Sequence, residues 1–190
     1  MTALAPSPSM TKTALRTTMR AARKAYVAGL SPQDRRELET ELAHHLRAIV
    51  EAAGEVGAYH ATGSEINPSS ALTHASSPSL PAFDAGQDGF RFRLGPATVA
   101  GTHGIPEPDP ASPLANCKLV LVPLLAVDAG GHRLGQGGGH YDRALPALRN
   151  AGARLVGIGW DMQKLQFALP SEPWDVPLDG FASPAGLEWF

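Results

Sequence analysis

One stretch constrains the fold of this chain more than any other: an apolar run followed closely by a glycine-rich loop. Residues 118–127 read KLVLVPLLAV, and residues 133–143 read RLGQGGGHYDR. A short apolar run bounded by turn residues is typical of a strand buried on both faces. Pro123 inside this run breaks the ladder or marks the end of the strand. The segment after the loop has a helical pattern that ends near Asn150, and residues 154–160 (RLVGIGW) read as a second strand.

These segments form a strand–helix–strand unit. Such units are right-handed and build parallel sheets whose faces are covered by helices. Two helices are expected upstream, one from about Thr11 to Ala28 and one after Ser31, a good N-cap followed by proline. A short helix is expected over roughly residues 68–75, and the chain after Trp160 is expected to be rich in loops. The sequence therefore predicts one α/β domain over residues 11–190, with three layers (αβα), a mostly parallel sheet and an N-terminal helical pair. Residues 1–10 are rich in Pro and Ser and are expected to be a disordered tail.

The glycine loop has the parts of a site for a magnesium-bound polyphosphate. Four of the five residues from 135 to 139 are glycines, so backbone N–H groups can approach a ligand closely. At the start of a helix, such a loop presents unpaired N–H groups and the positive end of the helix dipole. Arg133 adds positive charge, and Asp142 supplies a hard oxygen ligand. The Walker ending is absent, and His140 breaks the dinucleotide fingerprint. A purely structural glycine turn is the alternative.

The expected N-terminal helix carries two stripes. Apolar residues recur with helical spacing on one face: Leu15, Met19, Ala22 and Tyr26. A basic stripe lies beside it: Lys12, Arg16, Arg20 and Arg23. Lys12 and Arg16 lie about 6 Å apart along the axis, a spacing that can grip neighbouring phosphates. A solvated basic face is the alternative, and it is the interpretation kept for Arg20 and Arg23.

Composition and charge narrow the range of partners. The chain has 190 residues, enough for one domain, and 43% are hydrophobic. Its only cysteine, Cys117, excludes an intramolecular disulfide and reads as a small buried residue in a reducing compartment. No run approaches the ~20 apolar residues that span a bilayer, and no signal-peptide core is present. The protein is expected to be cytoplasmic and monomeric, with no membrane partner.

Charge is unevenly distributed along the chain. Residues 1–36 hold seven Lys/Arg and one acidic residue, whereas the remainder holds nine and seventeen. A basic patch on an acidic body can bind nucleic acid. Neither interleaved aromatic residues nor a known nucleic-acid module accompanies this patch, so an anionic small molecule is the better partner and no nucleic acid is expected.

The glycine loop resembles a family signature. RLGQGGGHYDR is similar to R-L-G-x-G-x-G-Y-Y-D-R of the 5-formyltetrahydrofolate cyclo-ligase (5,10-methenyltetrahydrofolate synthetase) family, and it departs at His140, where the family usually has Tyr. Three weaker matches follow the family's order: Lys12-x-x-x-Arg16, residues 104–108 (GIPEP) and residues 174–179 (WDVPLD). The resemblance covers residues from about 12 to 180.

The resemblance implies an ATP site with magnesium. The expected ATP-binding residues are Lys12, Arg16, Arg133, Leu134, Gly135, Gln136, Gly137, Gly138, Gly139, His140 and Tyr141. Asp142 and Asp175 are expected to hold Mg²⁺. The expected catalytic residues are Arg133, Tyr141 and Asp142.

The resemblance also implies a folate site. Its expected residues are Arg16, Glu65, His103, Gln136, Gly137, Gly138, Gly139 and His140. Glu65 follows an expected strand over residues 56–61, in the crevice where open α/β sheets bind ligands. His103 stands where the family's substrate-covering loop usually has an aromatic residue. Ala82 stands where the family usually has a basic residue, so one basic contact is either missing or supplied elsewhere, by Arg91 or Arg93. Two prolines flank Glu107 and stiffen the loop after His103.

The implied reaction is ATP- and Mg²⁺-dependent conversion of 5-formyltetrahydrofolate into 5,10-methenyltetrahydrofolate, with release of ADP and phosphate. Two other hypotheses remain open because of His140. One is a non-catalytic homologue that binds nucleotide or folate as a sensor or carrier. The other is an enzyme that phosphorylates a different substrate through the same loop. Retention of Arg133, Asp142, Asp175 and Glu65 together favours catalysis.

Overall fold

A seven-stranded sheet forms the centre of the computed structural model, which describes residues 5–84, 86, 89–101 and 104–190. The strands lie in the order β11-β10-β9-β6-β1-β2-β3. Their bounds are β1 Glu55–Gly57, β2 Ser77–Ala82, β3 Arg91–Leu94, β6 Leu119–Pro123, β9 Arg154–Ile158, β10 Gly180–Ser183 and β11 Gly186–Trp189. The five inner strands are parallel, and β3 and β11 run antiparallel at the two edges. The predicted mostly parallel sheet is confirmed.

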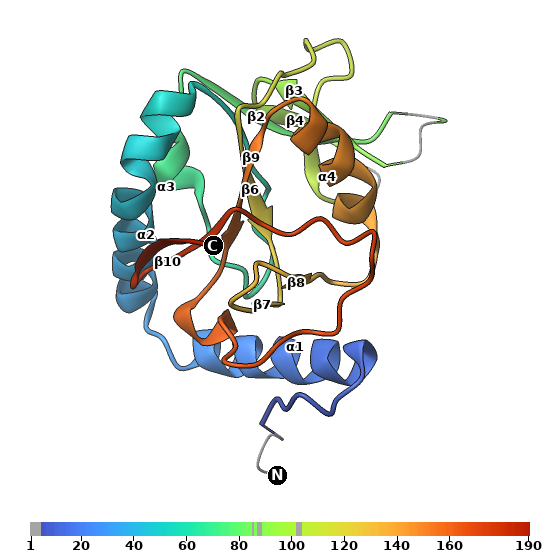
Figure 1. Cartoon of the computed structure of the whole chain (residues 1–190). Helices are drawn as coiled ribbons and strands as arrows, with labels where there is room; N and C mark the ends of the chain where they lie inside the picture. Colours follow the sequence, from blue (N-terminus) through green and yellow to red (C-terminus); the bar gives the residue numbers. More distant parts are fainter. Residues whose placement is uncertain (1–4, 85, 87–88, 102–103) are drawn as a thin grey trace.

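Helices cover both faces of this sheet (Figure 1). On one face lie α2 (Pro32–Ala53) and α3 (Ser69–Leu72), and Leu42, Leu46 and Val50 of α2 enter the core there. On the other face lies α4 (His140–Asn150), which buries Leu145 against the strands. The side chains of β6 alternate between the two cores because successive residues of a strand point to opposite faces. The three-layer αβα prediction is therefore confirmed.

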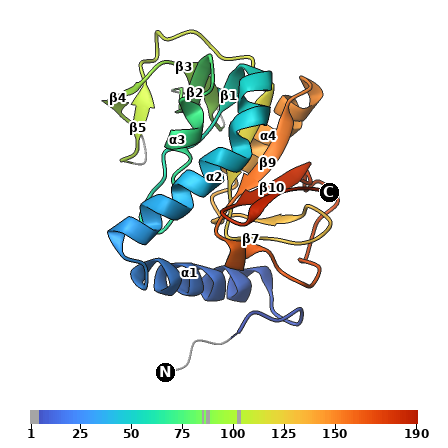
Figure 2. The same cartoon turned by 90° about the vertical axis from the view of Figure 1, so that its left-hand side faces the viewer.

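The first helix, α1 (Lys12–Ala28), lies across the carboxyl end of the sheet and covers neither of its faces (Figures 1 and 2). Thr11 caps it by accepting a hydrogen bond from the N–H of Ala14. Leu15 and Met19 of the predicted apolar stripe are buried in a cluster of their own. Their partners come from the turn after β6, from the hairpin of β7 (Ala126–Val127) and β8 (Arg133–Leu134), and from the segment near Leu165. This position turns the basic stripe of α1 toward the sheet's ligand-binding edge.

Three local predictions differ from the structure. The strand expected over residues 56–61 ends at Gly57, and only the N–H of Ala58 still reaches the sheet beyond it. Tyr59 then anchors the following loop, because its buried hydroxyl donates to the carbonyl of Ile66 at 2.6 Å. The helix expected over residues 68–75 is the single turn α3. The segment after Trp160, predicted to be mostly loop, contains the short helix η1 (Asp161–Gln163) and the hairpin of β10 and β11.

Smaller elements complete the chain. A two-stranded sheet of β4 (Ala97–Ala100) and β5 (Pro106–Pro108) contains the predicted substrate-covering loop. His103 lies outside the described residues. Residues 5–10 make a turn in which Met10 packs against the α1 cluster; residues 1–4 of the predicted tail lie outside the described part of the chain. No helix among the described residues is long and apolar enough to cross a bilayer.

Candidate active site

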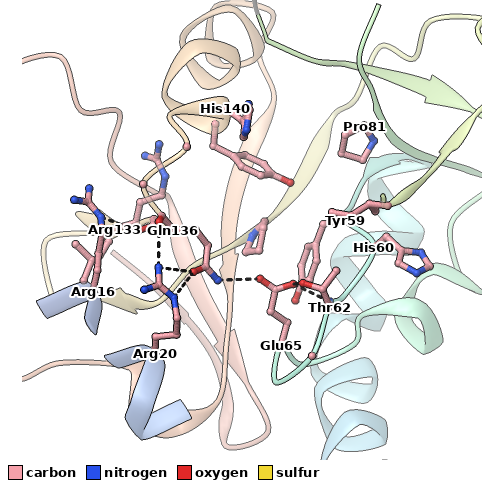
Figure 3. A pocket seen from close by; sticks show the side chains of 18 of the residues that line it. Arg16, Arg20, Tyr59, His60, Thr62, Glu65, Pro81, Arg133, Gln136 and His140 are labelled. Atoms are coloured by element: carbon pink, nitrogen blue, oxygen red, sulfur yellow. Dashed lines mark hydrogen bonds between the residues drawn. The ribbon is translucent and has the colours of Figure 1, made fainter. Parts of the chain in front are cut away.

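A cavity of about 930 Å³ opens at the carboxyl edge of the sheet. It lies between α1, the glycine loop of residues 135–139 and the segments that follow β1, β2 and β6. Every predicted site residue within the described part of the chain lines it. These residues are Lys12, Arg16, Glu65, Arg133, Leu134, Gly135, Gln136, Gly137, Gly138, Gly139, His140, Tyr141, Asp142 and Asp175. Figure 3 shows how several of them converge from distant parts of the sequence.

The glycine loop presents unpaired amides at the start of α4. Within the described part of the chain, the N–H groups of residues 135–139 donate to no protein acceptor. Gly137 and Gly139 have φ of 105° and 68°, a region that residues with a side chain rarely adopt. A Cβ at Gly139 would also lie 2.8 Å from the guanidinium of Arg143. The loop therefore requires glycine for its shape, and the free amides with the helix dipole suit an anion.

Two arginines of α1 bind backbone carbonyls of this loop. Arg16 donates to the carbonyl of Gly135 at 3.1 Å, and Arg20 donates to the carbonyl of Gln136 at 3.2 Å. In a trans peptide, a C=O and the next N–H point in opposite directions. The N–H groups of Gln136 and Gly137 are therefore directed away from the arginines that bind the neighbouring carbonyls.

Alternating charges line the end of the cavity beyond the loop. Arg133 is ion-paired with Asp142 and donates to the carbonyl of Val176 at 2.9 Å. Its side chain is only 5% exposed, and burial lowers the pKa of Arg133 against the opposing effects of Asp142 and Asp175. Lys12 lies 3.1 Å from Asp175. Burial raises the pKa of Asp175, but the N–H of Glu172 and the charges of Lys12 and Arg133 outweigh it and hold this pKa below the ordinary value.

The two carboxylates fit a Mg²⁺ ion that arrives with phosphates. Asp142 and Asp175 line the same cavity and both contact cationic side chains. Among the described residues, no group of three or more His, Cys, Asp or Glu side chains is placed to form a full metal cage. Mg²⁺ keeps several waters and is usually held by one or two carboxylates together with substrate phosphates. Two carboxylates in one cavity would therefore suit an ion that phosphates also hold.

The other end of the cavity is aromatic and more deeply buried. Tyr59 is 5% exposed, and its pKa is raised well above the ordinary value by burial and by the nearby charge of Glu65. The ring of Tyr141 lies edge-on to Phe90, with centroids 5.0 Å apart. Its hydroxyl is buried and has no partner among the described residues, and burial raises the pKa of Tyr141. His140 lies edge-on to Phe83 at 5.1 Å, so the departure from the family's Tyr retains an aromatic ring there.

Glu65 is a carboxylate of this aromatic end, and several hydrogen bonds fix it. It is 9% exposed, and its Oε2 accepts from the N–H and hydroxyl of Thr62 at 2.9 and 3.1 Å. Its Oε1 accepts from the side-chain amide of Gln136 at 3.3 Å and lies 3.8 Å from Arg23. Figure 3 shows Glu65 reaching toward Gln136 from the loop after β1.

The prediction of a solvated basic face is wrong for Arg23, which is only 5% exposed. Arg20 is exposed as predicted, and both residues line the cavity. Arg23 donates to the hydroxyl of Ser64 at 3.2 Å and to the carbonyl of Leu124 at 3.3 Å. Their spacing contained a signal, because the basic residues at 16, 20 and 23 repeat the intervals of the apolar residues at 15, 19 and 22 one residue later. They therefore flank the apolar stripe on the side that faces the site.

Arg91 and Arg93 do not replace the basic charge missing near Ala82. Both pair with Asp84, and neither lines the cavity. Glu107, which the sequence marked only as part of a stiff loop, is buried and accepts from the N–H of Phe83 at 2.8 Å. It ties β5 to the aromatic end of the cavity.

A parallel sheet with an anion-binding glycine loop at its carboxyl edge defines an α/β protein whose ligand site lies in the crevice beyond the strands. The comparison with known families is more specific. The chain belongs to the 5-formyltetrahydrofolate cyclo-ligase family, whose family model matches residues 8–184.

Individual relatives agree with this assignment. The 5-formyltetrahydrofolate cyclo-ligase of Escherichia coli (strain K12) is 40% identical over 78 residues, 40% of this chain and 42% of that protein. The Mycolicibacterium smegmatis protein of the same name is 37% identical over 98 residues, half of this chain and 49% of that protein. The matches thus span about half the length of the curated relatives or less. The Aquifex aeolicus 5,10-methenyltetrahydrofolate synthetase structure is similar over 95% of this chain and 93% of that chain, with a TM-score of 0.76 and 25% identity.

Proposed function

We propose that this protein converts 5-formyltetrahydrofolate into 5,10-methenyltetrahydrofolate, with ATP as the phosphoryl donor and ADP and phosphate as the other products. The observation that carries the proposal is the union of two different sites in one cavity. A glycine loop with free amides and acidic residues lies at one end, and a buried aromatic pocket with Glu65 lies at the other. The volume of about 930 Å³ lies near the upper limit for small-molecule sites, which suits two ligands side by side.

The first step of the proposed reaction is phosphoryl transfer. The formyl oxygen attacks the γ-phosphorus of ATP, the bond to the bridging oxygen breaks, and ADP leaves. Phosphoryl transfer requires little covalent chemistry from a protein, so alignment and charge stabilisation dominate. The amides of residues 135–139, with Lys12, Arg16 and Arg133, would bind and orient the triphosphate. When bound, Mg²⁺ would neutralise charge on the phosphate oxygens, with Asp142 and Asp175 as its protein ligands.

The second step is ring closure. Phosphorylation turns the formyl group into an activated imidate phosphate. N10 attacks its carbon and loses its proton to the departing phosphate or to solvent, and inorganic phosphate leaves as the C–O bond breaks. Glu65, fixed by Thr62, would accept an N–H of the pterin ring. The buried hydroxyl of Tyr141 has no partner among the described residues, so a polar atom of the bound substrate would satisfy it. The rings of Phe83 and His140 would pack beside the pterin.

The test is turnover of 5-formyltetrahydrofolate with ATP and Mg²⁺, followed by the absorbance of the methenyl product. Product is expected only when all three are present, and ADP should accumulate in equal amount. Binding of ATP or folate by calorimetry without any product would support the sensor or carrier hypothesis, with His140 as the first residue to restore to Tyr. ATP hydrolysis that depends on a different acceptor would favour the third hypothesis.

A further inference from the structure

A chain of hydrogen bonds crosses the cavity from α1 to the aromatic end. The Nε and one terminal nitrogen of Arg20 donate to the side-chain oxygen of Gln136 at 3.3 and 3.2 Å. The amide nitrogen of Gln136 donates in turn to Oε1 of Glu65 at 3.3 Å. Figure 3 shows Gln136 between these two partners, with its side chain bridging the glycine loop and the loop after β1. The side-chain amide of Gln136 therefore accepts from a cation through its oxygen and donates to a carboxylate through its nitrogen.

The three members of this bridge are held to different degrees. Glu65 is fixed by the two bonds from Thr62 and by the nearby Arg23, and Arg20 projects from a helix. Gln136 stands between Gly135 and Gly137, in a segment whose backbone amides have no protein partner among the described residues. Glycine-rich backbone has a large conformational freedom that must be lost when the segment is ordered. The side chain of Gln136 therefore adds a restraint from the aromatic end to a loop that arginines otherwise hold through its carbonyls.

The bridge is compatible with a bound folate. An ionised carboxylate offers about four acceptor sites, and Thr62 and Gln136 occupy three of those of Glu65. Arg23 lies at 3.8 Å from Oε1, beyond the usual hydrogen-bond distance. One acceptor site on Oε1 is thus available for a ligand N–H while Gln136 stays in place.

We propose that Arg20 and Gln136 are a positioning pair that couples the two halves of the cavity. A ligand that binds Oε1 of Glu65 beside the amide of Gln136 also holds that amide in place and so orders the glycine loop, and a nucleotide then binds with a smaller loss of entropy. By thermodynamic reciprocity, nucleotide bound at the loop strengthens folate binding by the same factor. The inference rests on the proposed function for the identity of the two ligands, but it concerns binding and needs no turnover.

The experiment is a calorimetric binding cycle with 5-formyltetrahydrofolate and the Mg²⁺ complex of a non-hydrolysable β,γ-methylene ATP analogue. In the unchanged protein, each ligand is expected to tighten the other by at least about fivefold. Gln136→Ala and Arg20→Ala should each bring this ratio to within about twofold of one. Arg20→Lys should retain more coupling than Arg20→Ala, because an ammonium can still donate to the amide oxygen.

Gln136→Glu separates the two contacts of the bridge. A carboxylate at this position keeps its attraction to Arg20 but repels Glu65, so the coupling should be lost as completely as in Gln136→Ala. Matched controls are Gln33→Ala and Arg36→Ala, exposed positions on α2 that lie outside the cavity. Both should keep the full coupling and the same melting temperature.

Each result has a defined meaning. Independent binding of the two ligands to the unchanged protein would overturn the inference even if turnover is normal. Coupling that survives Gln136→Ala would overturn it as well, and it would assign communication to some other contact. Failure of folate or the ATP analogue to bind at all would instead contradict the proposed function, which separates the two failures.

Discussion

The two ends of the cavity are built by different means. The end at the glycine loop, where we propose that the triphosphate binds, is called the phosphate end. It consists of backbone amides and charged side chains, and the side chain of Asp142 there is 56% exposed. The aromatic end consists of buried side chains on loops fixed to the sheet, such as Tyr59 at 5% exposure. A charge at the phosphate end can be removed with little change in packing. A change at the aromatic end alters the core of the protein, so recognition and stability are coupled there and largely separate at the loop.

The largest expected effect is that of Asp142→Ala at the phosphate end. Loss of a carboxylate that holds Mg²⁺ against the triphosphate should reduce kcat by a factor of about 10³ or more. Asp142 is exposed, and Arg133, which would lose it, still donates to the carbonyl of Val176 and keeps the nearby charge of Asp175, so the melting temperature should change by only a few degrees at most. Steady-state kinetics and a thermal melt on the same preparation test both halves of this statement. Full activity in this variant would show that the metal site is misassigned.

Glu65→Gln is the matching change at the aromatic end. It should raise the KM for 5-formyltetrahydrofolate about tenfold or more and also lower the melting temperature. The physical reason is that Arg23, 5% exposed, would lose the carboxylate near it and remain as a buried cation. The KM and the melting temperature should therefore both change in Glu65→Gln, whereas Asp142→Ala should change activity with little change in melting temperature. A rise in KM with no loss of stability would break the comparison between the two ends.

Asp84→Asn tests the ion pairs between Asp84, which follows β2, and the two arginines of β3. Hydrogen bonds from Arg91 and Arg93 hold the pKa of Asp84 below its ordinary value. A depressed folded-state pKa contributes stability that is present above the unfolded pKa, near 4, and is lost as the pH falls through the folded pKa. Asp84→Asn should therefore be less stable by about 1 kcal/mol or less at pH 7, and this difference should shrink toward pH 3. A difference that grows on acidification would contradict the assignment.

The smallest functional effect is expected at Cys117, which lies outside the cavity. Burial raises the pKa of its thiol to about 11, against a hydrogen bond with Ser79. Since the thiolate is the reactive species, modification by a thiol reagent at pH 8 should be about a hundredfold slower than for a free cysteine. Unfolding should restore the ordinary rate. Rapid native-state modification, or its suppression by folate alone, would place Cys117 nearer to the site than its contacts indicate.

The central part of the fold could be predicted because local pattern and tertiary structure agree there. The apolar run became β6 with Pro123 as its last residue, and the glycine loop leads directly into α4, which ends at Asn150 as predicted. The hairpin of β10 and β11 was missed because the sequence around it is rich in proline and lacks a long apolar run. Its strand β10 is nevertheless buried, because it pairs with β9 on one side and with β11 on the other and contacts α2.

The site was predictable to the extent that its residues lie in continuous motifs. Residues 133–142 gather around one loop, and family resemblance added Lys12, Glu65 and Asp175, which the fold brings to the same cavity. The place of Arg23 in the site was missed because it depends on contacts with Glu65 and Leu124, which lie far away in sequence. A basic helical residue is usually solvated, and only the three-dimensional position of α1 reverses that expectation.

The position of α1 has a consequence for how the protein acquires its site during synthesis. Leu15 and Met19 leave the ribosome early, but their buried partners lie at Leu125, Leu134 and Leu169. Translation at roughly 5–20 residues per second separates the helix from these partners by several seconds or more. During that interval the basic amphipathic segment has no native surface to cover its apolar stripe. The nascent chain is therefore expected to need protection of this segment, and the ligand cavity forms only after residues up to Asp175 have been synthesised.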